Sequence, residues 1–184
     1  MKQVHSFVAS NSIGGIGEAL FYSLVSHVFP EKEIEDVTKI KKWQKSGIDF
    51  IVDGVYYDVK FDIKANATGN LALETISKSK NGVVEKEGWV YTSKADCVVY
   101  VTLVGLDWAF YFFTKPETLN LAKKYKDNKK SVYNYGYESE VILVPKNSLE
   151  NKKIIFQNVL GEEITDNNKS IFSQVHDFFL RRKK

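Results

Sequence analysis

The clearest alternation of apolar and polar residues along the chain lies in residues 47–64, GIDFIVDGVYYDVKFDIK. Two runs with strand composition flank Asp53-Gly54, a dipeptide typical of a two-residue hairpin turn. Counting outward from this turn pairs Val52 with Val55, Ile51 with Tyr56, Phe50 with Tyr57, and Asp49 with Asp58. The sequence therefore predicts a β-hairpin in which two aspartates lie opposite each other.

The two faces of this hairpin differ in polarity. Side chains alternate along a strand, so Asp58 and Lys60 share a face, and the cross-strand pairing places Asp49 on it too. Carboxylates opposed at about 5 Å repel each other, and a divalent cation between them would offset the repulsion. The other face is apolar and consists of Val55, Tyr57, Val59, Phe61 and Ile63. We therefore expect a metal site on the polar face.

The pattern before the hairpin predicts a helix from about Ile16 to Phe29, stopped by Pro30. Its start, SIGGIGEAL, is similar to the glycine-rich turn of short-chain dehydrogenases, where phosphate binds at a helix N-terminus. The preceding HSFVAS is a poor strand, however, and no Tyr-x-x-x-Lys follows in a plausible position. We interpret the glycines as a tight entry into the helix.

Glu18 is the informative residue of this helix. Positions 18, 21, 25 and 28 (Glu, Phe, Val and Val) follow the spacing of one helical face. Glu18 thus lies at the N-terminal end of an apolar stripe. Two interpretations remain: a first-turn glutamate stabilised by the helix dipole, or an acid directed at the face that carries Asp49 and Asp58.

A charged segment, EKEIEDVTKIKKWQKSG, leads directly into the hairpin. A lysine run with an embedded aromatic suits a phosphate backbone with a base or sugar beside it. The alternative is a solvated strand or loop whose Trp43 simply packs. The candidate nucleic-acid-binding residues are Lys39, Lys41, Lys42, Trp43 and Lys45, together with Lys64 beyond the hairpin.

The rest of the chain predicts further strands and a second helix. Residues 68–70 indicate a turn into a strand, LALETIS, followed by a charged, mobile loop over residues 77–88. CVVYVTLV is typical of a central strand covered on both faces, and WAFYFF is its hairpin partner. Pro116 opens a helix at a first-turn position. This order predicts an α/β fold with a central mixed β-sheet flanked by helices.

The last third of the chain gives fewer indications. Tyr133, Tyr135 and Tyr137 share a face if their stretch is extended, either stacking on bases or, more commonly, packing in a core or a dimer. KIIFQNV predicts another strand, and NNKSIFSQVHDFFL predicts a terminal amphipathic helix. We expect a single domain over residues 1–184, with a core of about 14–125 and a C-terminal elaboration of about 126–184.

Composition sets outer limits on this picture. The 184 residues include 26 Lys and Arg against 23 Asp and Glu, so the net charge of +3 does not by itself indicate a nucleic-acid binder. Cys97 is the single cysteine, which excludes a disulfide framework and a cysteine-based zinc site. The sequence has neither an apolar leader nor an 18-residue apolar run. We expect a cytoplasmic protein without membrane contact.

Three of these features together resemble the PD-(D/E)XK nuclease superfamily: Glu18 in the first helix, Gly-Ile-Asp ending at Asp49, and Asp58-Val59-Lys60. The similarity extends through TGNLALE, GWVY and KADCVVY, a pattern of small phage or mobile-element members, and covers roughly residues 14–113. Asp49 follows Ile rather than Pro, and Asp62-Ile63-Lys64 is a competing D-x-K motif. We prefer the first motif because the hairpin register sets Asp58 opposite Asp49.

The resemblance implies a restriction-endonuclease-like core and a metal-dependent deoxyribonuclease that hydrolyses phosphodiester bonds in DNA. Junction resolution, restriction and phage DNA processing all fit this activity, with a homodimer making paired cuts. The alternative is a catalytically inactive module on the same fold that binds nucleic acid or a partner protein.

The implied site uses hard oxygen ligands, which suit Mg²⁺ or Mn²⁺. Asp49, Asp58 and the carbonyl of Val59 would hold the metal, and Glu18 would join through water or bind a second ion. Lys60 would position the attacking water or stabilise the charge of the transition state. Additional candidate site residues are Asp62, Glu74 and Ser77.

Overall fold

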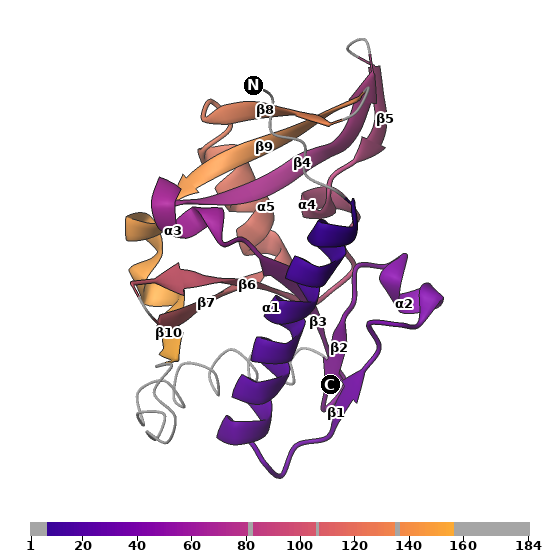
Figure 1. The fold of residues 1–184 in the computed structure, drawn as a ribbon, viewed down its shortest axis with the longest axis vertical. Helices are drawn as coiled ribbons and strands as arrows, with labels where there is room; N and C mark the ends of the chain where they lie inside the picture. Colours follow the sequence, from indigo (N-terminus) through magenta and orange to yellow (C-terminus); the bar gives the residue numbers. More distant parts are fainter. Residues whose placement is uncertain (1–6, 81–82, 106, 135–136, 157–184) are drawn as a thin grey trace.

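The fold combines two β-sheets with five α-helices in the part of the chain that the structure describes (Figure 1). The computed structural model describes residues 7–80, 83–105, 107–134 and 137–156. The helices are α1 (Phe7–Val28), α2 (Lys41–Gln44), α3 (Lys64–Thr68), α4 (Trp89–Thr92) and α5 (Lys115–Lys124), with a 3-10 helix η1 (Lys146–Lys152). The expected α/β class with a mixed sheet flanked by helices is confirmed.

The larger sheet has six strands in the order β1-β2-β3-β6-β7-β10. Its strands are β1 (Ile34–Asp36), β2 (Phe50–Val52), β3 (Val55–Phe61), β6 (Cys97–Val104), β7 (Asp107–Thr114) and β10 (Lys153–Phe156). Only the β3–β6 pair is parallel. A parallel pair needs a crossover connection, and here the crossover contains α3, β4, β5 and α4.

The smaller sheet has four antiparallel strands in the order β5-β4-β9-β8. Its strands are β4 (Asn70–Lys80), β5 (Val83–Glu87), β8 (Lys129–Asn134) and β9 (Tyr137–Pro145). Within the predicted loop over residues 77–88, residues 77–80 belong to β4 and residues 83–87 to β5, so the prediction of a loop is wrong for these residues. Strand β5 pairs with β4, and β4 pairs with β9, although the charged composition of this segment is typical of a loop.

Helix α1 begins nine residues earlier than the sequence predicted and contains the glycine run instead of starting after it. A Cβ atom on Gly17 would lie 2.6 Å from the Cβ of Phe61 on β3, so this glycine allows the helix to approach the sheet closely. The helix ends at Val28, close to the predicted stop before Pro30. Within the described residues, no helix is long and apolar enough to cross a membrane.

The main core lies between α1 and the six-stranded sheet. Phe21, Leu24 and Val25 of the helix are fully buried against the apolar face of β3 and the adjoining faces of β6 and β7. The apolar hairpin face predicted from the sequence is thus confirmed from Val55 to Phe61. Ile63 is the exception, 51% exposed, because β3 ends at Phe61.

A second core fills the opposite side of the six-stranded sheet. Tyr100, Tyr111 and Phe113 pack there against Leu71 and Leu73 of β4, with contributions from β9, α5 and η1. Strand β6 is therefore covered on both faces, as CVVYVTLV predicted, and β7 is its hairpin partner. Helix α5 has the predicted first-turn proline, and it also starts with a capping box between Thr114 and Glu117.

The C-terminal third is only partly as expected. Strand β8 ends at Asn134, which pairs with Tyr137 at the start of β9, so Tyr133 and Tyr137 lie on different strands. Tyr133 is 55% exposed, and Tyr135 lies outside the described residues. The strand predicted at KIIFQNV is confirmed as β10, whereas the predicted terminal helix also lies outside them.

Candidate active site

The site begins with the predicted hairpin. Strands β2 and β3 are joined by Asp53-Gly54, whose φ angles are 45° and 77°, as a two-residue primed turn requires. The pairs Val52–Val55, Ile51–Tyr56 and Phe50–Tyr57 all form. The register that the dipeptide predicted is confirmed for these three pairs.

The ladder does not continue to the fourth predicted pair. The amide of Asp49 donates to the carbonyl of Tyr57 at 2.8 Å, although Tyr57 already pairs with Phe50. Two successive residues of the first strand thus oppose one residue of the second, which is the arrangement of a β-bulge. The direct Asp49–Asp58 pairing is corrected: the bulge turns Asp49 toward the edge of β3 beyond Tyr57.

Among the described residues, the part of β3 beyond Tyr57 has a strand partner only on its β6 side. The amide of Val59 faces the open side and donates to Oδ2 of Asp49 at 2.8 Å. Because the N–H and C=O of one strand residue point to the same side, the Val59 carbonyl faces this open edge as well. A carboxylate and a main-chain carbonyl therefore meet where the sheet is unpaired.

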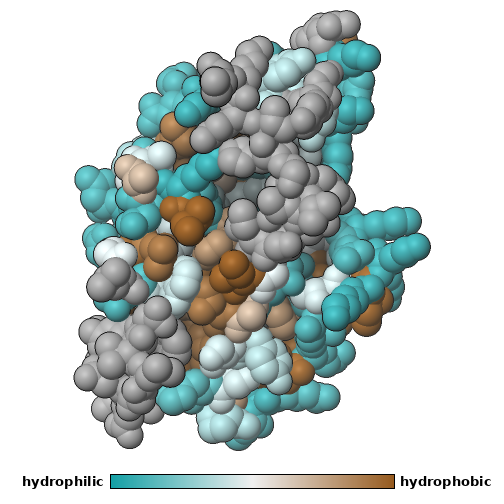
Figure 2. Space-filling view, viewed as in Figure 1, coloured by the Kyte–Doolittle hydropathy of each residue, from teal (hydrophilic) through white to brown (hydrophobic). Residues whose placement is uncertain are grey.

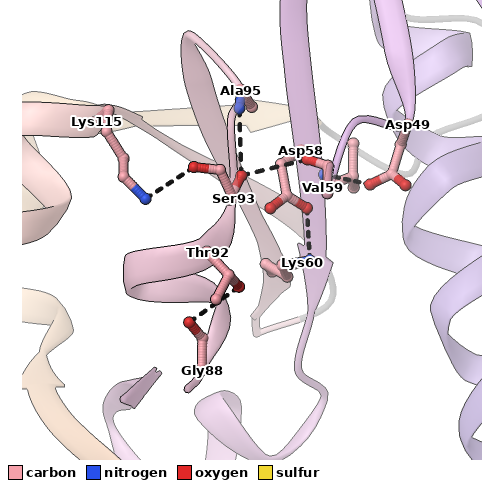
Figure 3. Close-up of polar contacts among 10 residues, drawn as sticks. Asp49, Asp58, Val59, Lys60, Gly88, Thr92, Ser93, Ala95 and Lys115 are labelled. Carbon is pink, nitrogen blue, oxygen red and sulfur yellow. Dashed lines mark hydrogen bonds and ion pairs between the residues drawn. The ribbon is translucent and has the colours of Figure 1, made fainter. Parts of the chain in front are cut away.

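Asp58 and Lys60 lie side by side on the face of β3 that is turned away from α1 (Figure 3). Nζ of Lys60 is 2.5 Å from Oδ1 of Asp58, whose side chain is fully buried while that of Lys60 is 27% exposed. Apart from this ion pair, neither carboxylate oxygen of Asp58 has a hydrogen-bond partner among the described residues. A buried carboxylate with so few partners is uncommon and indicates a functional group.

Gly47 and Ser93 form the wall opposite Asp58. Gly47 has a φ of +62°, and a Cβ atom there would lie 3.3 Å from Oδ2 of Asp58. The hydroxyl of Ser93 donates to the Gly47 carbonyl at 3.2 Å and accepts from the amide of Ala95 at 3.3 Å. The wall thus comes from two loops that are distant in sequence.

Lys115, at the start of α5, ties this wall to the second core. Its Nζ donates to the carbonyl of Val90 at 2.7 Å and to that of Ser93 at 2.9 Å (the Ser93 bond is drawn in Figure 3). Burial lowers the pKa of Lys115, and the charge of Asp58 opposes that shift. Sequence reasoning missed Gly47, Ser93 and Lys115, although GWVY and KAD flank the wall.

Burial and neighbouring negative charge raise the pKa values of two carboxylates, Asp49 and Glu18. Burial and the neighbouring Asp58 raise the pKa of Asp49 to about 7. Burial and the nearby Asp36 raise the pKa of Glu18, which Lys60 partly opposes. Glu18 is half-buried and acts electrostatically on Asp49 as well. Because α1 begins at Phe7, Glu18 is not a first-turn residue, and the interpretation of it as a first-turn glutamate is wrong; its direction toward the site stays a prediction.

Lys60 is the cation among these carboxylates. Burial lowers its pKa, but Asp58, Asp49 and Glu74 outweigh burial and hold the pKa above its ordinary value. Its Nζ also lies 5.7 Å from the ring centroid of Trp89, within range of a cation–π contact. Glu74 was a candidate from the sequence, whereas Trp89 was missed because a lone tryptophan in GWVY gives no sign of its neighbour.

The donor set suits a hard divalent cation. Asp58 brings buried oxygens that lack hydrogen-bond donors, and Asp49 and the Val59 carbonyl bring oxygen atoms at the adjoining edge. In the described ranges, however, no three Asp, Glu, His or Cys side chains are already arranged to hold a metal. The lysine ammonium lies among these carboxylates instead.

The predicted nucleic-acid-binding residues separate into two places. Lys39, Lys41, Lys42 and Lys45 are exposed on and around α2, and Figure 2 shows hydrophilic residues there. Trp43 packs against Tyr56 with ring centroids 5.4 Å apart, beneath Nζ of Lys42. Lys64 lies in α3, on the other side of α1 from α2 (Figure 1).

The competing D-x-K motif has a structural role. Asp62 lies past the end of β3, where its Oδ1 accepts from the amide of Lys64 at the start of α3 and its Oδ2 accepts from the hydroxyl of Tyr100. Ser77 contributes its carbonyl to a hydrogen bond from Ser139 within the smaller sheet. Neither Asp62 nor Ser77 has a described contact with Asp49 or Asp58.

Comparisons of the chain with protein-family models, with curated proteins and with solved structures found no match.

Proposed function

We propose that the protein is a metal-dependent nuclease that hydrolyses phosphodiester bonds in DNA. The observation that carries the proposal is the buried carboxylate of Asp58, whose only described partner is Lys60, next to the raised-pKa carboxylate of Asp49 at an open strand edge. A purely structural ion pair between Asp58 and Lys60 would not need a second acid beside it. A site that binds a divalent cation next to a reactive phosphate needs more than one carboxylate.

The chain's own groups have distinct tasks in this reaction. Asp49, Asp58 and the Val59 carbonyl would hold Mg²⁺ or Mn²⁺, which supplies Lewis acidity and lowers the pKa of a bound water. Lys60 places a compact positive charge where the phosphate gains negative charge. Glu18, reaching the site from α1, adds a further carboxylate at the same edge. The exposed lysines of α2 contact the phosphate backbone on the flank.

Cleavage assays on two charge-removing variants test the proposal. We expect Asp58→Asn and Lys60→Met each to lower the rate at least about 100-fold, since each removes a group that acts on the reacting phosphate. Plasmid, linear, branched and single-stranded DNA would be incubated with Mg²⁺, with Mn²⁺ and with EDTA. Circular dichroism would confirm that both variants fold.

The same hairpin provides a matched control. Lys32 and Asp53 form an ion pair of 2.7 Å at the turn, distant from Asp58 along β3. Lys32→Met and Asp53→Asn should cleave at the wild-type rate. Cleavage at the wild-type rate by the Asp58 and Lys60 variants would refute the assignment. If the protein binds DNA but does not cleave it with any divalent ion present, it is a non-catalytic module instead.

A further inference from the structure

Lys60 is the positively charged group among the carboxylates of the site. Its ammonium pairs with Oδ1 of Asp58 at 2.5 Å, and Asp49, Glu74 and Glu18 all interact with it electrostatically. No other described group donates a hydrogen bond to the Asp58 carboxylate. In the metal-free protein, Lys60 therefore provides the charge balance that a divalent cation would otherwise provide.

A divalent metal ion and the Lys60 ammonium cannot both bind the carboxylate of Asp58. The carboxylate is fully buried, so water cannot screen a metal ion from an ammonium bound to the same group. Gly47 and Ser93 close the space next to Oδ2, where even a Cβ atom on Gly47 would come within 3.3 Å. A metal that binds Asp58 must therefore displace the ammonium.

The ammonium that pairs with Asp58 already has two further neighbours. Its Nζ lies 5.7 Å from the ring centroid of Trp89, and Glu74 acts on it electrostatically from β4. These two groups are held together by the backbone: the amide of Gly88 donates to the carbonyl of Thr75 at 2.9 Å. A Cβ atom on Gly88 would lie only 2.1 Å from the carbonyl oxygen of Glu74, so Trp89 is fixed against this part of β4.

We propose that Lys60 exchanges between two places: paired with Asp58 without metal, and displaced onto Trp89 and Glu74 when a divalent cation binds. Trp89 and Glu74 are then positioning residues that stabilise the displaced lysine and keep its charge beside the phosphate. This inference rests on the proposed metal dependence but not on cleavage.

Isothermal titration of the full chain with Mn²⁺, in the absence of nucleic acid, tests the exchange. Lys60→Met removes the competing cation, so its Mn²⁺ affinity should rise about tenfold. Trp89→Leu removes the second place and should lower the affinity about threefold or more. Trp89→Phe keeps an aromatic face and should retain most of the wild-type affinity.

A double-mutant cycle separates exchange from simple packing or charge effects. In the Lys60→Met background, Trp89→Leu should leave the affinity unchanged, because there is no lysine to receive. Glu74→Gln should weaken binding more with Lys60 present than without it. Lys32 is a matched control, paired with Asp53 at 2.7 Å and 5.6 Å from the Phe29 ring centroid; Lys32→Met should change nothing.

The outcomes are distinguishable from failure of the nuclease proposal. Unchanged or weaker Mn²⁺ binding by Lys60→Met, or an equal loss from Trp89→Leu in both backgrounds, would overturn the exchange. So would absence of Mn²⁺ binding in both the wild type and Lys60→Met. If the expected cycle is observed but no nucleic acid is cut, the exchange stands and the nuclease proposal fails.

Discussion

The surroundings of Asp49 disfavour the charged form of its carboxylate. Burial and the charge of Asp58 raise its pKa to about 7, whereas the Val59 amide favours the charged form and limits the rise. Near neutral pH the metal-free protein therefore either carries an extra proton or bears the cost of a buried charge. A bound divalent cation would remove this cost, so proton and metal compete for the same carboxylate.

This competition predicts a pH-dependent effect of Asp49→Asn. Because the folded-state pKa lies above the ordinary value of 3.8, the stability linked to the proton is complete below about pH 4 and is lost as pH rises through about 7. Without metal, the Asp49→Asn protein should be more stable than wild type near pH 8, on the order of 2 kcal/mol, with a much smaller gain near pH 5. Urea denaturation in EDTA measures both differences.

Metal gives the complementary control. Saturating Mg²⁺ should stabilise the wild type near pH 8 and leave Asp49→Asn almost unaffected, since only the wild type keeps the ligand. A stability gain of equal size from Asp49→Asn at both pH values would contradict the raised pKa of Asp49.

Among the elements, α1 crosses closely over β3 at Gly17. Gly17 lies directly against Phe61, and the next residue is Glu18, which acts electrostatically on Asp49. Glycine costs helix stability relative to alanine, by about 1 kcal/mol. The position is therefore occupied by glycine for its packing and not for its helix propensity.

Two alanine substitutions in the same helix should have opposite effects. Gly17→Ala would place a Cβ atom 2.6 Å from the Cβ of Phe61, and overpacking of this kind costs about 1–3 kcal/mol. Gly14→Ala meets no atom within 4 Å and should stabilise the protein by about 0.5–1 kcal/mol. Thermal unfolding of both variants provides the measurement.

Gly17→Ala should also weaken Mn²⁺ binding, because it pushes Glu18 and α1 away from the site, while Gly14→Ala should not. Equal stability changes at the two positions would contradict the close packing of Gly17 on Phe61.

In the whole molecule, a short chain segment links the basic surface around α2 to the site. The segment after Lys45 runs directly to Gly47 and Asp49, and the amide of Lys94 donates to the carbonyl of Ser46 at 2.8 Å. Lys94 thus adds an exposed lysine that the sequence analysis did not include. Cations on this flank would direct a phosphate backbone toward the carboxylates.

Salt dependence can locate this surface. Replacing Lys41 and Lys45 by alanine should weaken DNA binding and reduce the slope of log K against log[salt] by about 0.9 for each lost phosphate contact. Lys64→Ala is the control, because α3 lies on the other side of α1 from α2 (Figure 1). Fluorescence anisotropy at several salt concentrations would measure the slopes, and an equal loss from Lys64→Ala would argue against an α2 surface.

Several local features could be predicted from short-range chemistry alone. Asp53-Gly54 set the turn and three pairs of the hairpin, because few dipeptides favour positive φ at both positions. The spacing of Phe21, Val25 and Val28 identified the buried face of α1. Alternation along β3 placed Asp58 beside Lys60.

Packing between distant segments, in contrast, brings these pieces together as a site. At Asp49 the carboxylate accepts from the Val59 amide and the main-chain amide donates to the Tyr57 carbonyl, a departure from regular pairing that pairing rules do not reveal. Ser93 donates to the Gly47 carbonyl, Lys115 donates to the Ser93 carbonyl, and Trp89 lies beside Lys60, all between segments that are distant in sequence. Such contacts depend on how sheets and helices pack, and no local pattern in the sequence encodes them.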